Sequence, residues 1–483
     1  MMNFRKMLSA SVSGATFLAV WLAASPGYAL TLKEAVNTAL HSNPEIGQAI
    51  ENREAIEFEL RQAKGLYLPS VDLEGSVGVR LLDNPSRRAL DLDDDELNPA
   101  EIGVVVTQKL LDFGARRAEV DRQASRVDGA SLRVLERSQV IALAVVQDYL
   151  EYLLQAKIVA DTAQNVGFHQ GILGEIREGV EGGALTDADR QQAEERLLAA
   201  KARNVEALGE LEESKIRFYK TVGVPLAKPS MPGSVAGSLP TSLDSAIGLA
   251  RENSPRIKAA RSDIDTAAAD VRAAHSKYYP ELFAEGRART GTDVDGTEDT
   301  TNDLQARLVL RWNLYRGGID RANEQEKIRR ASEQRLVLHQ VDREIEEVVR
   351  TSWDRRFRRA DLAKLLRAQS STNDALVSSY REQFKVGQRS LLDVLDAQNT
   401  RFNTKILADT ASFASLFAEY RILATTGSLV DVLGLSAPEQ AEAYARAEFN
   451  TPAAPEGDDY ARTPSRQAND IPLDLLAPIR KKK

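Results

Sequence analysis

The 483-residue sequence contains no cysteine and only four histidines. Without cysteine the chain can form neither disulfide bonds nor thiolate metal sites, and its redox compartment stays undetermined. His41, His169, His275 and His339 lie far apart and lack the spacing of a metal-binding motif. The sequence also has no nucleophile elbow, phosphate-binding loop or zinc motif. We therefore expect no metal, no cofactor and no enzymatic activity.

Proline is absent from two long stretches, residues 114–183 and 317–387. Because proline ends or kinks helices, each stretch can form one uninterrupted helix of about 100 Å at 1.5 Å per residue. Small and apolar residues recur at alternating spacings of three and four along the first stretch and again over residues 193–218, as in the seam of a coiled coil. Helices of this length exceed what a globular core requires.

Each long stretch ends in a glycine that is followed by Ser or Thr and then by acidic residues. The first turn contains Gly183, Thr186 and Asp189, and the second contains Gly387, Ser390, Asp393 and Asp396. A glycine that ends one helix, a hydroxyl that caps the next and acids in its first turn predict a tight reversal. We expect these tips at about 180–190 and 384–392, followed by shorter returning helices over about 186–222 and 390–432.

Short blocks of sequence recur in the same order in both halves of the chain. Leu32-Lys-Glu-Ala-Val recurs as Leu243-Asp-Ser-Ala-Ile, and Tyr67-Leu-Pro recurs as Tyr278-Tyr-Pro. The spacing is too long for a solenoid unit and indicates a duplicated half-structure. We divide the chain into repeats at 30–222 and 243–435, a Pro-, Gly- and Ser-rich linker at 223–242, and a disordered tail at 436–483 that ends in Lys-Lys-Lys.

Four segments alternate between apolar and polar residues. They lie at about 70–82, 101–112, 281–290 and 303–315. Period-two alternation is typical of a half-buried soluble sheet and also of a barrel with lipid outside and water inside. Aromatic residues stand at the strand ends that join the helices and would therefore lie at one height in the structure. This arrangement favours the membrane alternative, because aromatic residues form a belt at the membrane–water interface. These residues are Tyr67, Phe113, Tyr278, Tyr279, Trp312 and Tyr315.

Four strands are too few to close a barrel, since the smallest bacterial barrels have about eight. An open sheet would leave two unpaired edges in lipid, where unsatisfied backbone groups are not tolerated. If the strands lie in a membrane, the chain must therefore share its barrel with other copies.

Residues 1–29 have the features of a secretory signal peptide. Arg5 and Lys6 precede a short apolar run, and small residues stand before Leu30 as in a cleavage site. The alternative is a membrane anchor, for which the apolar run is short. The mature protein is therefore expected to be exported.

The remaining charged motifs have ordinary explanations. The net charge is −8, which implies no bulk attraction to nucleic acid. The acidic stretches at 91–95 and 293–296 lack EF-hand spacing and are interpreted as surface loops, although pieces of a calcium site are an alternative. The four arginines at 355, 356, 358 and 359 around Phe357 predict either a solvated helix face or a docking surface for a partner protein.

Taken together, these features resemble the TolC family of outer membrane efflux and type I secretion channels, over about residues 30–435. The tip motif at 387–397 is the most specific part. The resemblance implies a mainly α fold with a small β part, in which duplicated helical hairpins form a periplasmic tunnel beside a mixed α/β belt. Four strands per protomer would enter a shared twelve-stranded barrel in the outer membrane of a Gram-negative bacterium.

The function implied by the resemblance is a passive exit duct of a tripartite efflux pump or type I secretion system. Its implied partners are two further copies of the chain, outer membrane lipid, a periplasmic adaptor, and an inner-membrane RND or ABC transporter. The adaptor would dock at the tip turns formed by Gly183, Thr186, Gly387 and Ser390. A periplasmic coiled-coil adaptor or structural protein is the alternative, but an adaptor would have one hairpin, whereas this chain predicts two.

The resemblance also implies roles for residues at the entrance. Arg389 matches an entrance-latch arginine, and Asp189 matches its acidic partner. Phe384 stands where the family often has tyrosine, so one hydroxyl hydrogen bond is lost. Asp393 and Asp396 match aspartate rings that favour cations. From the residues alone, both aspartates could equally be first-turn acids, and Arg389 a solvated tip residue.

Overall fold

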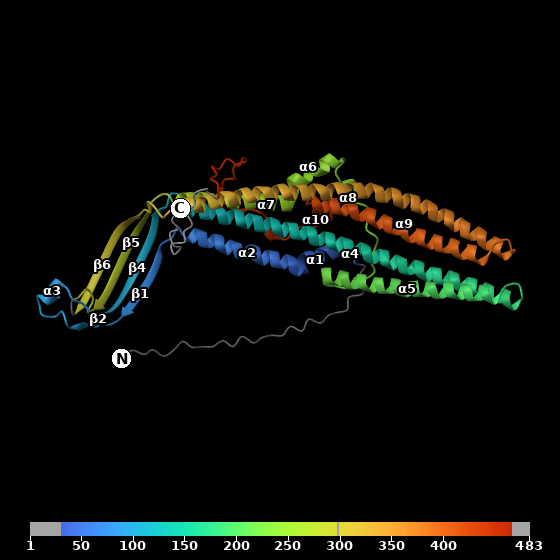
Figure 1. Ribbon diagram of the computed structural model, residues 1–483, viewed down its shortest axis with the longest axis horizontal. Helices are drawn as coiled ribbons and strands as arrows, with labels where there is room; N and C mark the ends of the chain where they lie inside the picture. Colours follow the sequence, from blue (N-terminus) through green and yellow to red (C-terminus); the bar gives the residue numbers. More distant parts are fainter. Residues whose placement is uncertain (1–29, 297–298, 466–483) are drawn as a thin grey trace, which may run out of the picture.

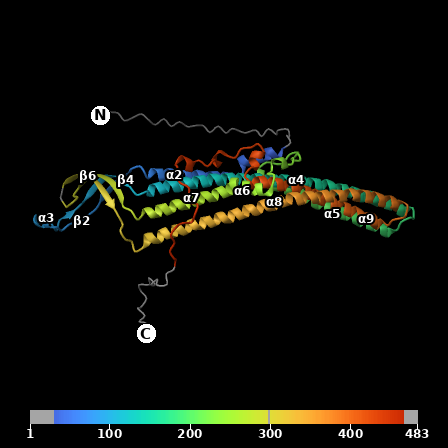
Figure 2. The same cartoon turned by 90° about the horizontal axis from the view of Figure 1, so that it is seen from above.

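The computed structural model describes residues 30–296 and 299–465. The predicted signal peptide and the end of the predicted tail, residues 466–483, lie outside the described residues. The molecule is elongated, with a β-sheet at one end and two helical hairpins reaching to the other end (Figure 1). A view from above shows the same separation of sheet and hairpins (Figure 2).

The two halves of the chain contain the same series of helices. Each half has a short helix, a middle helix, a long helix and a returning helix. In the first half these are α1 (Leu32–Ser42), α2 (Pro44–Gly65), α4 (Ala115–Glu181) and α5 (Asp187–Val222). In the second half they are α6 (Leu243–Asn253), α7 (Pro255–Ser276), α8 (Ile319–Lys385) and α9 (Leu391–Thr425). The long helices α4 and α8 are both 67 residues, so both tips reach the same level.

Glycines in the left-handed conformation mark both ends of the long helices. Gly114 (φ 94°) and Gly318 (φ 82°) precede α4 and α8, and Gly183 (φ 74°) and Gly387 (φ 76°) follow them. A side chain disfavours this conformation, so glycine is the residue that permits each reversal. Gly427 (φ 77°) also explains why α9 ends at Thr425, short of the predicted 432, and is followed by the separate α10 (Leu429–Val432).

Four antiparallel strands form one sheet in the order β1-β4-β5-β6. Their bounds are β1 (Ser70–Val77), β4 (Ala100–Leu111), β5 (Glu281–Thr292) and β6 (Thr300–Arg311). The register places Leu73, Val104, Ala288 and Leu304 in one row across the sheet. The adjacent row, on the opposite face, is Glu74, Gly103, Arg289 and Asp303. One face is therefore apolar and the other charged.

Two strand predictions differ from the structure. β6 ends at Arg311 rather than 315, because its partner β5 begins at Glu281, directly after Pro280, which has no N–H for the ladder. β1 ends at Val77 rather than at 82, and the loop that connects it to β4 contains β2 (Arg80–Leu81), α3 (Pro85–Arg88) and β3 (Glu96–Leu97). The buried Arg87 holds this loop by donating to the carbonyls of Leu92 (2.5 Å), Asp95 (3.1 Å) and Gly296 (3.1 Å).

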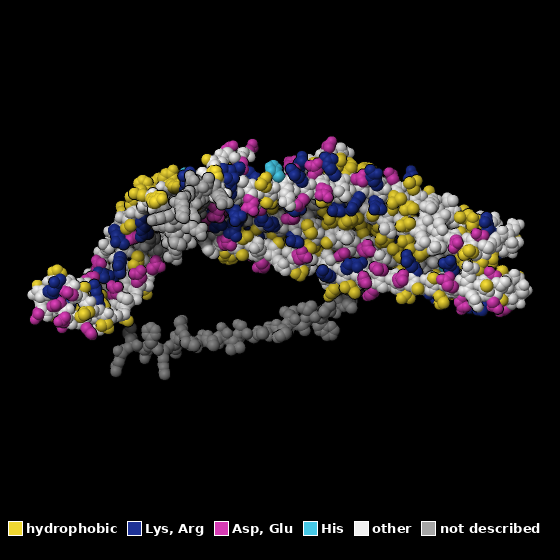
Figure 3. All heavy atoms as spheres, viewed as in Figure 1, with side chains coloured by type: hydrophobic (Ala, Val, Ile, Leu, Met, Phe, Trp, Pro, Cys, Tyr) yellow, Lys and Arg dark blue, Asp and Glu magenta, His cyan; other side chains and the backbone are white. Residues whose placement is uncertain are grey.

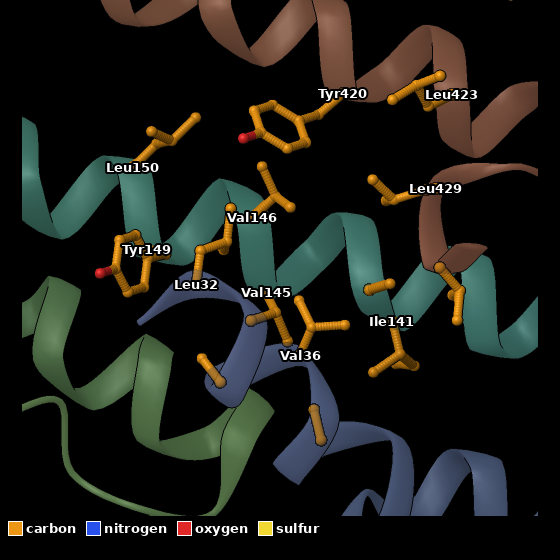
Figure 4. Close-up of a cluster of buried hydrophobic side chains, with 14 of the residues drawn as sticks. Leu32, Val36, Ile141, Val145, Val146, Tyr149, Leu150, Tyr420, Leu423 and Leu429 are labelled. Carbon is orange, nitrogen blue, oxygen red and sulfur yellow. The ribbon is translucent and has the colours of Figure 1, made fainter. Parts of the chain in front are cut away.

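The main core lies midway along the molecule, where α1, α4, α5, α9 and α10 meet (Figure 4). Two buried tyrosines fasten the linker between the repeats to this core. The Tyr149 hydroxyl accepts from the Ser230 N–H (3.0 Å), and the Tyr420 hydroxyl donates to the Gly233 carbonyl (2.9 Å). Burial raises the pKa of Tyr420 to about 12, so the hydroxyl keeps its proton.

Residues 436–465, which we name the C-terminal strap, are ordered, and the prediction of disorder is wrong for them. The strap includes η2 (Glu439–Ala441) and α11 (Ala445–Glu448) and then crosses the long helices. Asp128 of α4 accepts from the N–H groups of Ala445 (2.7 Å) and Arg446 (3.2 Å), and Asp265 of α7 accepts from Ala454 (2.7 Å). Burial raises the pKa of both carboxyls. These acceptors fix the strap together with Tyr444, Ala445 and Phe449, which pack against an apolar cluster of α2 and α4.

Candidate functional site at the hairpin tips

Both tips are closed by the same local structure. Thr186 and Asp189 form a capping box at the start of α5, with the Thr186 hydroxyl donating to the carboxylate (2.7 Å). Ser390 and Asp393 form the matching box at the start of α9 (2.8 Å). Each box satisfies N–H groups that the first turn of a helix leaves unpaired. The turns predicted from the sequence are therefore present in both hairpins.

An apolar cluster joins the two tips just above these turns. Its buried members come from α4, α5 and α9, and they include Ile172, Ile176, Leu197, Leu391 and Leu395. Tyr380 and Phe384 of α8 pack against this cluster. Phe384 therefore has a packing role in this arrangement, for which a hydroxyl is not required.

The contacts of Arg389 lie within its own hairpin. Its Nε donates to Gln383 (3.0 Å), its guanidinium lies 4.2 Å from the ring centre of Tyr380, and Asp393 is 4.0 Å away. The predicted partner Asp189 is engaged in the Thr186 capping box of the other hairpin. Within one chain the structure thus does not pair Arg389 with Asp189.

The two predicted ring aspartates have different surroundings. Asp393 accepts from the backbone N–H of Ser390 (3.3 Å) as well as from its hydroxyl, so in the single chain it acts as a first-turn acid. Asp396 is exposed one turn further along α9 and lies 3.8 Å from the guanidinium of Arg196 on α5. No sequence pattern links Arg196 with Asp396, because they belong to different hairpins.

Ion pairs that sequence reasoning missed connect the two hairpins above the tips. Arg381 of α8 pairs with Glu175 of α4. Further along, Lys157 of α4 pairs with Asp409 of α9 (2.6 Å), and Lys405 of α9 pairs with Asp161 of α4 (2.7 Å). We name the last four residues the charge clamp. On each helix the lysine and the aspartate of the clamp are four residues apart. In the sequence this spacing is typical of an ion pair on the solvated face of a single helix.

The residues predicted as an aromatic girdle all lie where the sheet meets the helices. Phe113 and Tyr279 stack with ring centres 5.1 Å apart, and the Trp312 indole N–H donates to the Tyr278 carbonyl (3.1 Å). Tyr67 lies beneath the guanidinium of Arg116 (4.7 Å), and Tyr315 is exposed. These six residues thus form an aromatic layer at the junction between β-strands and helices.

The remaining charged motifs make local contacts. Arg356 lies over the rings of Trp353 and Phe357, and Arg358 pairs with Asp354 (2.7 Å). Asp295 of the second acidic loop pairs with Arg289 (2.5 Å). Among residues 30–296 and 299–465 no group of His, Asp and Glu could hold a metal ion. No helix in these ranges is both long enough and apolar enough to cross a lipid bilayer.

The fold, with its paired hairpins and small sheet, is that of bacterial outer membrane channels. It matches the outer membrane channel CmeC of Campylobacter jejuni with a TM-score of 0.73 and 15% sequence identity, covering 87% of this chain and 89% of CmeC. The family model described as outer membrane efflux protein matches residues 35–224 and 246–425. The chain therefore belongs to the outer membrane efflux protein family, whose fold is that of channels rather than of enzymes.

Two relatives align over most of the chain. The outer membrane efflux protein BepC of Brucella suis is 24% identical over 376 residues, which cover 77% of this chain and 80% of BepC. The alkaline protease secretion protein AprF of Pseudomonas aeruginosa is 24% identical over 420 residues, which cover 83% of this chain and 85% of AprF.

Proposed function

We propose that three copies of this chain form a passive channel-tunnel in the outer membrane, the exit duct of a tripartite efflux pump or type I secretion system. The observation that carries this proposal is the sheet with one apolar and one charged face. It lies at one end of the molecule, and the two hairpin tips lie together at the other end. In a tunnel the sheet end lies in the membrane and the hairpins extend through the periplasm.

The sheet supports assembly from several copies. Its outer strands β1 and β6 each have one unpaired edge, which lipid does not tolerate. Three copies joined edge to edge give a closed barrel of twelve strands, with apolar rows toward lipid and charged rows toward water. The aromatic layer at the junction then lies at the periplasmic membrane surface.

The helices support the same assembly, because α5 and α8 carry exposed apolar side chains that no contact among the described residues covers. On α5 these include Leu198, Val205 and Ile216, which are 61%, 67% and 64% exposed. On α8 they include Leu336 and Leu365, which are 70% and 69% exposed. Hydrophobic side chains also gather around the two hairpins in the space-filling view (Figure 3). Neighbouring copies would cover these stripes.

The tips are the proposed docking and gating end. A periplasmic adaptor contacts the turns at Gly183, Thr186, Gly387 and Ser390, and an RND or ABC transporter of the inner membrane supplies the energy. Arg389 reaches Asp189 of a neighbouring copy to hold the entrance closed, and Asp393 and Asp396 form carboxylate rings at its narrowest point. The relatives are described as an efflux protein and a protease secretion protein, so both small molecules and polypeptides are candidate cargoes.

The alternative, a periplasmic adaptor, is not favoured. A single-hairpin adaptor has no use for the second hairpin or for a four-stranded sheet with two open edges.

The test is to purify the protein from outer membranes in detergent and insert it into planar bilayers. We expect trimers that resist dissociation when heated in gel sample buffer, and small, cation-selective single-channel openings. A soluble monomer after signal removal, or well-folded trimers without any conductance, would contradict the duct. The same preparation from cells that do not produce this chain is the control for contaminating porins.

A further inference from the structure

A polar cavity of about 350 Å³ lies between α4, α5 and α9, beside Asp396 and above the apolar tip cluster. Its polar lining residues are Asn165, His169, Arg196, Arg203, Asn399 and Asn403. Leu395, Phe402 and two alanines complete the walls. The cavity thus presents cationic and amide groups, and no carboxylate belongs to its lining.

Two nitrogen atoms at this cavity are buried without a hydrogen-bond partner among the described residues. They are Nδ1 of His169, a side chain only 6% exposed, and Nε of Arg196. An arginine side chain carries its charge and its N–H donors at every physiological pH. A buried donor that lacks an acceptor is rare in native proteins, so Nε of Arg196 marks a place where an acceptor fits. Nδ1 of His169 can donate to the same acceptor in the tautomer that carries the ring proton there.

The carboxylates nearest to the arginines do not fill this role. Arg196 is 3.5 Å from Glu195 and 3.8 Å from Asp396, and Arg203 is 3.8 Å from Glu206. These distances exceed those of charge-assisted hydrogen bonds, which are about 2.7–2.9 Å. Burial, and then the charge of Arg196, lower the pKa of His169, so this ring is neutral at pH 7 and offers one donor.

We propose that this cavity is a binding site for a carboxylate-bearing anion, held by Arg196 and Arg203 with His169 and the amides of Asn399 and Asn403. The surplus of donors excludes a cation, and the polar lining disfavours an apolar guest. Two arginine forks suit carboxylates, which they can bind with two parallel hydrogen bonds. The cavity is large enough for a small di- or tricarboxylate or for one acidic end of a longer molecule.

The location of the site rests on the proposed function. Asp396, Asn399 and Asn403 are at positions i, i+3 and i+7 of α9 and therefore lie on one face of the helix. If Asp396 faces the lumen of the tunnel, the anion site faces it too, directly inside the entrance. A carboxylate that passes the acidic rings would then be received by Arg196 and Arg203.

Citrate is the probe, and binding and conductance are measured separately. Calorimetric titration of the detergent-purified protein with citrate should detect binding to the wild type, weakened at least tenfold in the double variant Arg196→Gln, Arg203→Gln. In bilayers, citrate added at the entrance side should reduce the single-channel current of the wild type, and the double variant should need at least tenfold more citrate for the same reduction.

Arg190→Gln is the matched control. Arg190 is on the same helix, pairs with Asp187 (3.1 Å) and Glu194 (3.4 Å), and does not line the cavity. If the double variant does not fold, Arg203→Gln alone serves, because this side chain is 60% exposed. Its substitution should also weaken citrate binding.

The outcomes separate the two proposals. Equal citrate binding by the wild type and both variants, or no binding by a protein that conducts, overturns the anion site and leaves the duct standing. Citrate binding that depends on Arg196 and Arg203 in a protein that does not conduct supports the site and overturns the duct.

Discussion

Arg389 combines three contacts that hold it against its own hairpin, and each of them leaves part of its guanidinium free. It stacks on Tyr380, donates from Nε to the side-chain oxygen of Gln383 and lies at the limit of ion pairing with Asp393. Its side chain is 37% exposed, so it can also reach a neighbouring copy. Because Phe384 has no hydroxyl, the proposed latch depends more heavily on this one arginine.

We therefore expect Arg389→Ser to loosen the entrance and raise the single-channel conductance severalfold, since the variant removes the only charge proposed to cross between copies at this level. Lys385→Ser is the control, because Lys385 is at the same tip and pairs with Glu382 of its own helix (3.0 Å). Equal conductance in the wild type and Arg389→Ser would remove Arg389 from the latch.

At the level of helices, the charge clamp is a polar link between the two hairpins of one chain. Asp161 and Asp409 are 8% and 9% exposed, and one oxygen of each carboxylate is buried without a hydrogen-bond partner among the described residues. Each carboxylate thus depends on a single lysine from the other hairpin. Loss of either lysine leaves a largely buried negative charge without its counter-ion.

Lys157→Asp should destabilise the packing of α9 on α4 by about 1–3 kcal/mol, between the values for exposed and buried pairs. The measurement is the temperature at which trimers dissociate on gels, and we expect it to fall. The swapped pair Lys157→Asp, Asp409→Lys should restore most of the loss. Lys215→Asp is the control, because Lys215 of α5 is similarly exposed and pairs within its own helix with Glu212. A swap that gives no recovery would mean that the clamp does not stabilise the assembly.

These elements differ in how far the sequence could predict them. The hairpins and their tips follow from local rules, because glycine, a hydroxyl cap and first-turn acids act within a few residues. The clamp could not be predicted, since Lys157 and Asp409 are brought together only by the packing of two helices. The order of the strap was missed for the same reason: its acceptors Asp128 and Asp265 lie far away in the sequence.

At the scale of the whole molecule, the duplication determines which surfaces are left for other copies. Apolar residues from both halves pack into the main core. By contrast, α5 and α8 expose apolar side chains, and the outer strands of the sheet each leave one edge unpaired among the described residues. The alternation of the strands predicted which residues share a face, but only the register brought Leu73, Val104, Ala288 and Leu304 into one row. That row is the physical reason to place the sheet in lipid.

The proposed aspartate rings also belong to this scale, because one chain supplies only one carboxylate to each ring. The carboxylate of Asp393 accepts the hydrogen bonds of the Ser390 cap. The side chain of Asp396 is 63% exposed, and its nearest guanidinium, that of Arg196, is 3.8 Å away.

We expect Asp393→Asn with Asp396→Asn to weaken the cation preference, because rings of carboxylates concentrate cations in a pore. Asparagine keeps an oxygen that can accept the hydrogen bonds of the cap, so the fold should persist. Of the single variants, Asp396→Asn should account for the larger part of the change in reversal potential under a salt gradient. An unaltered reversal potential in the double variant would refute the rings, and a larger effect from Asp393→Asn would mean that the cap opens when the trimer forms.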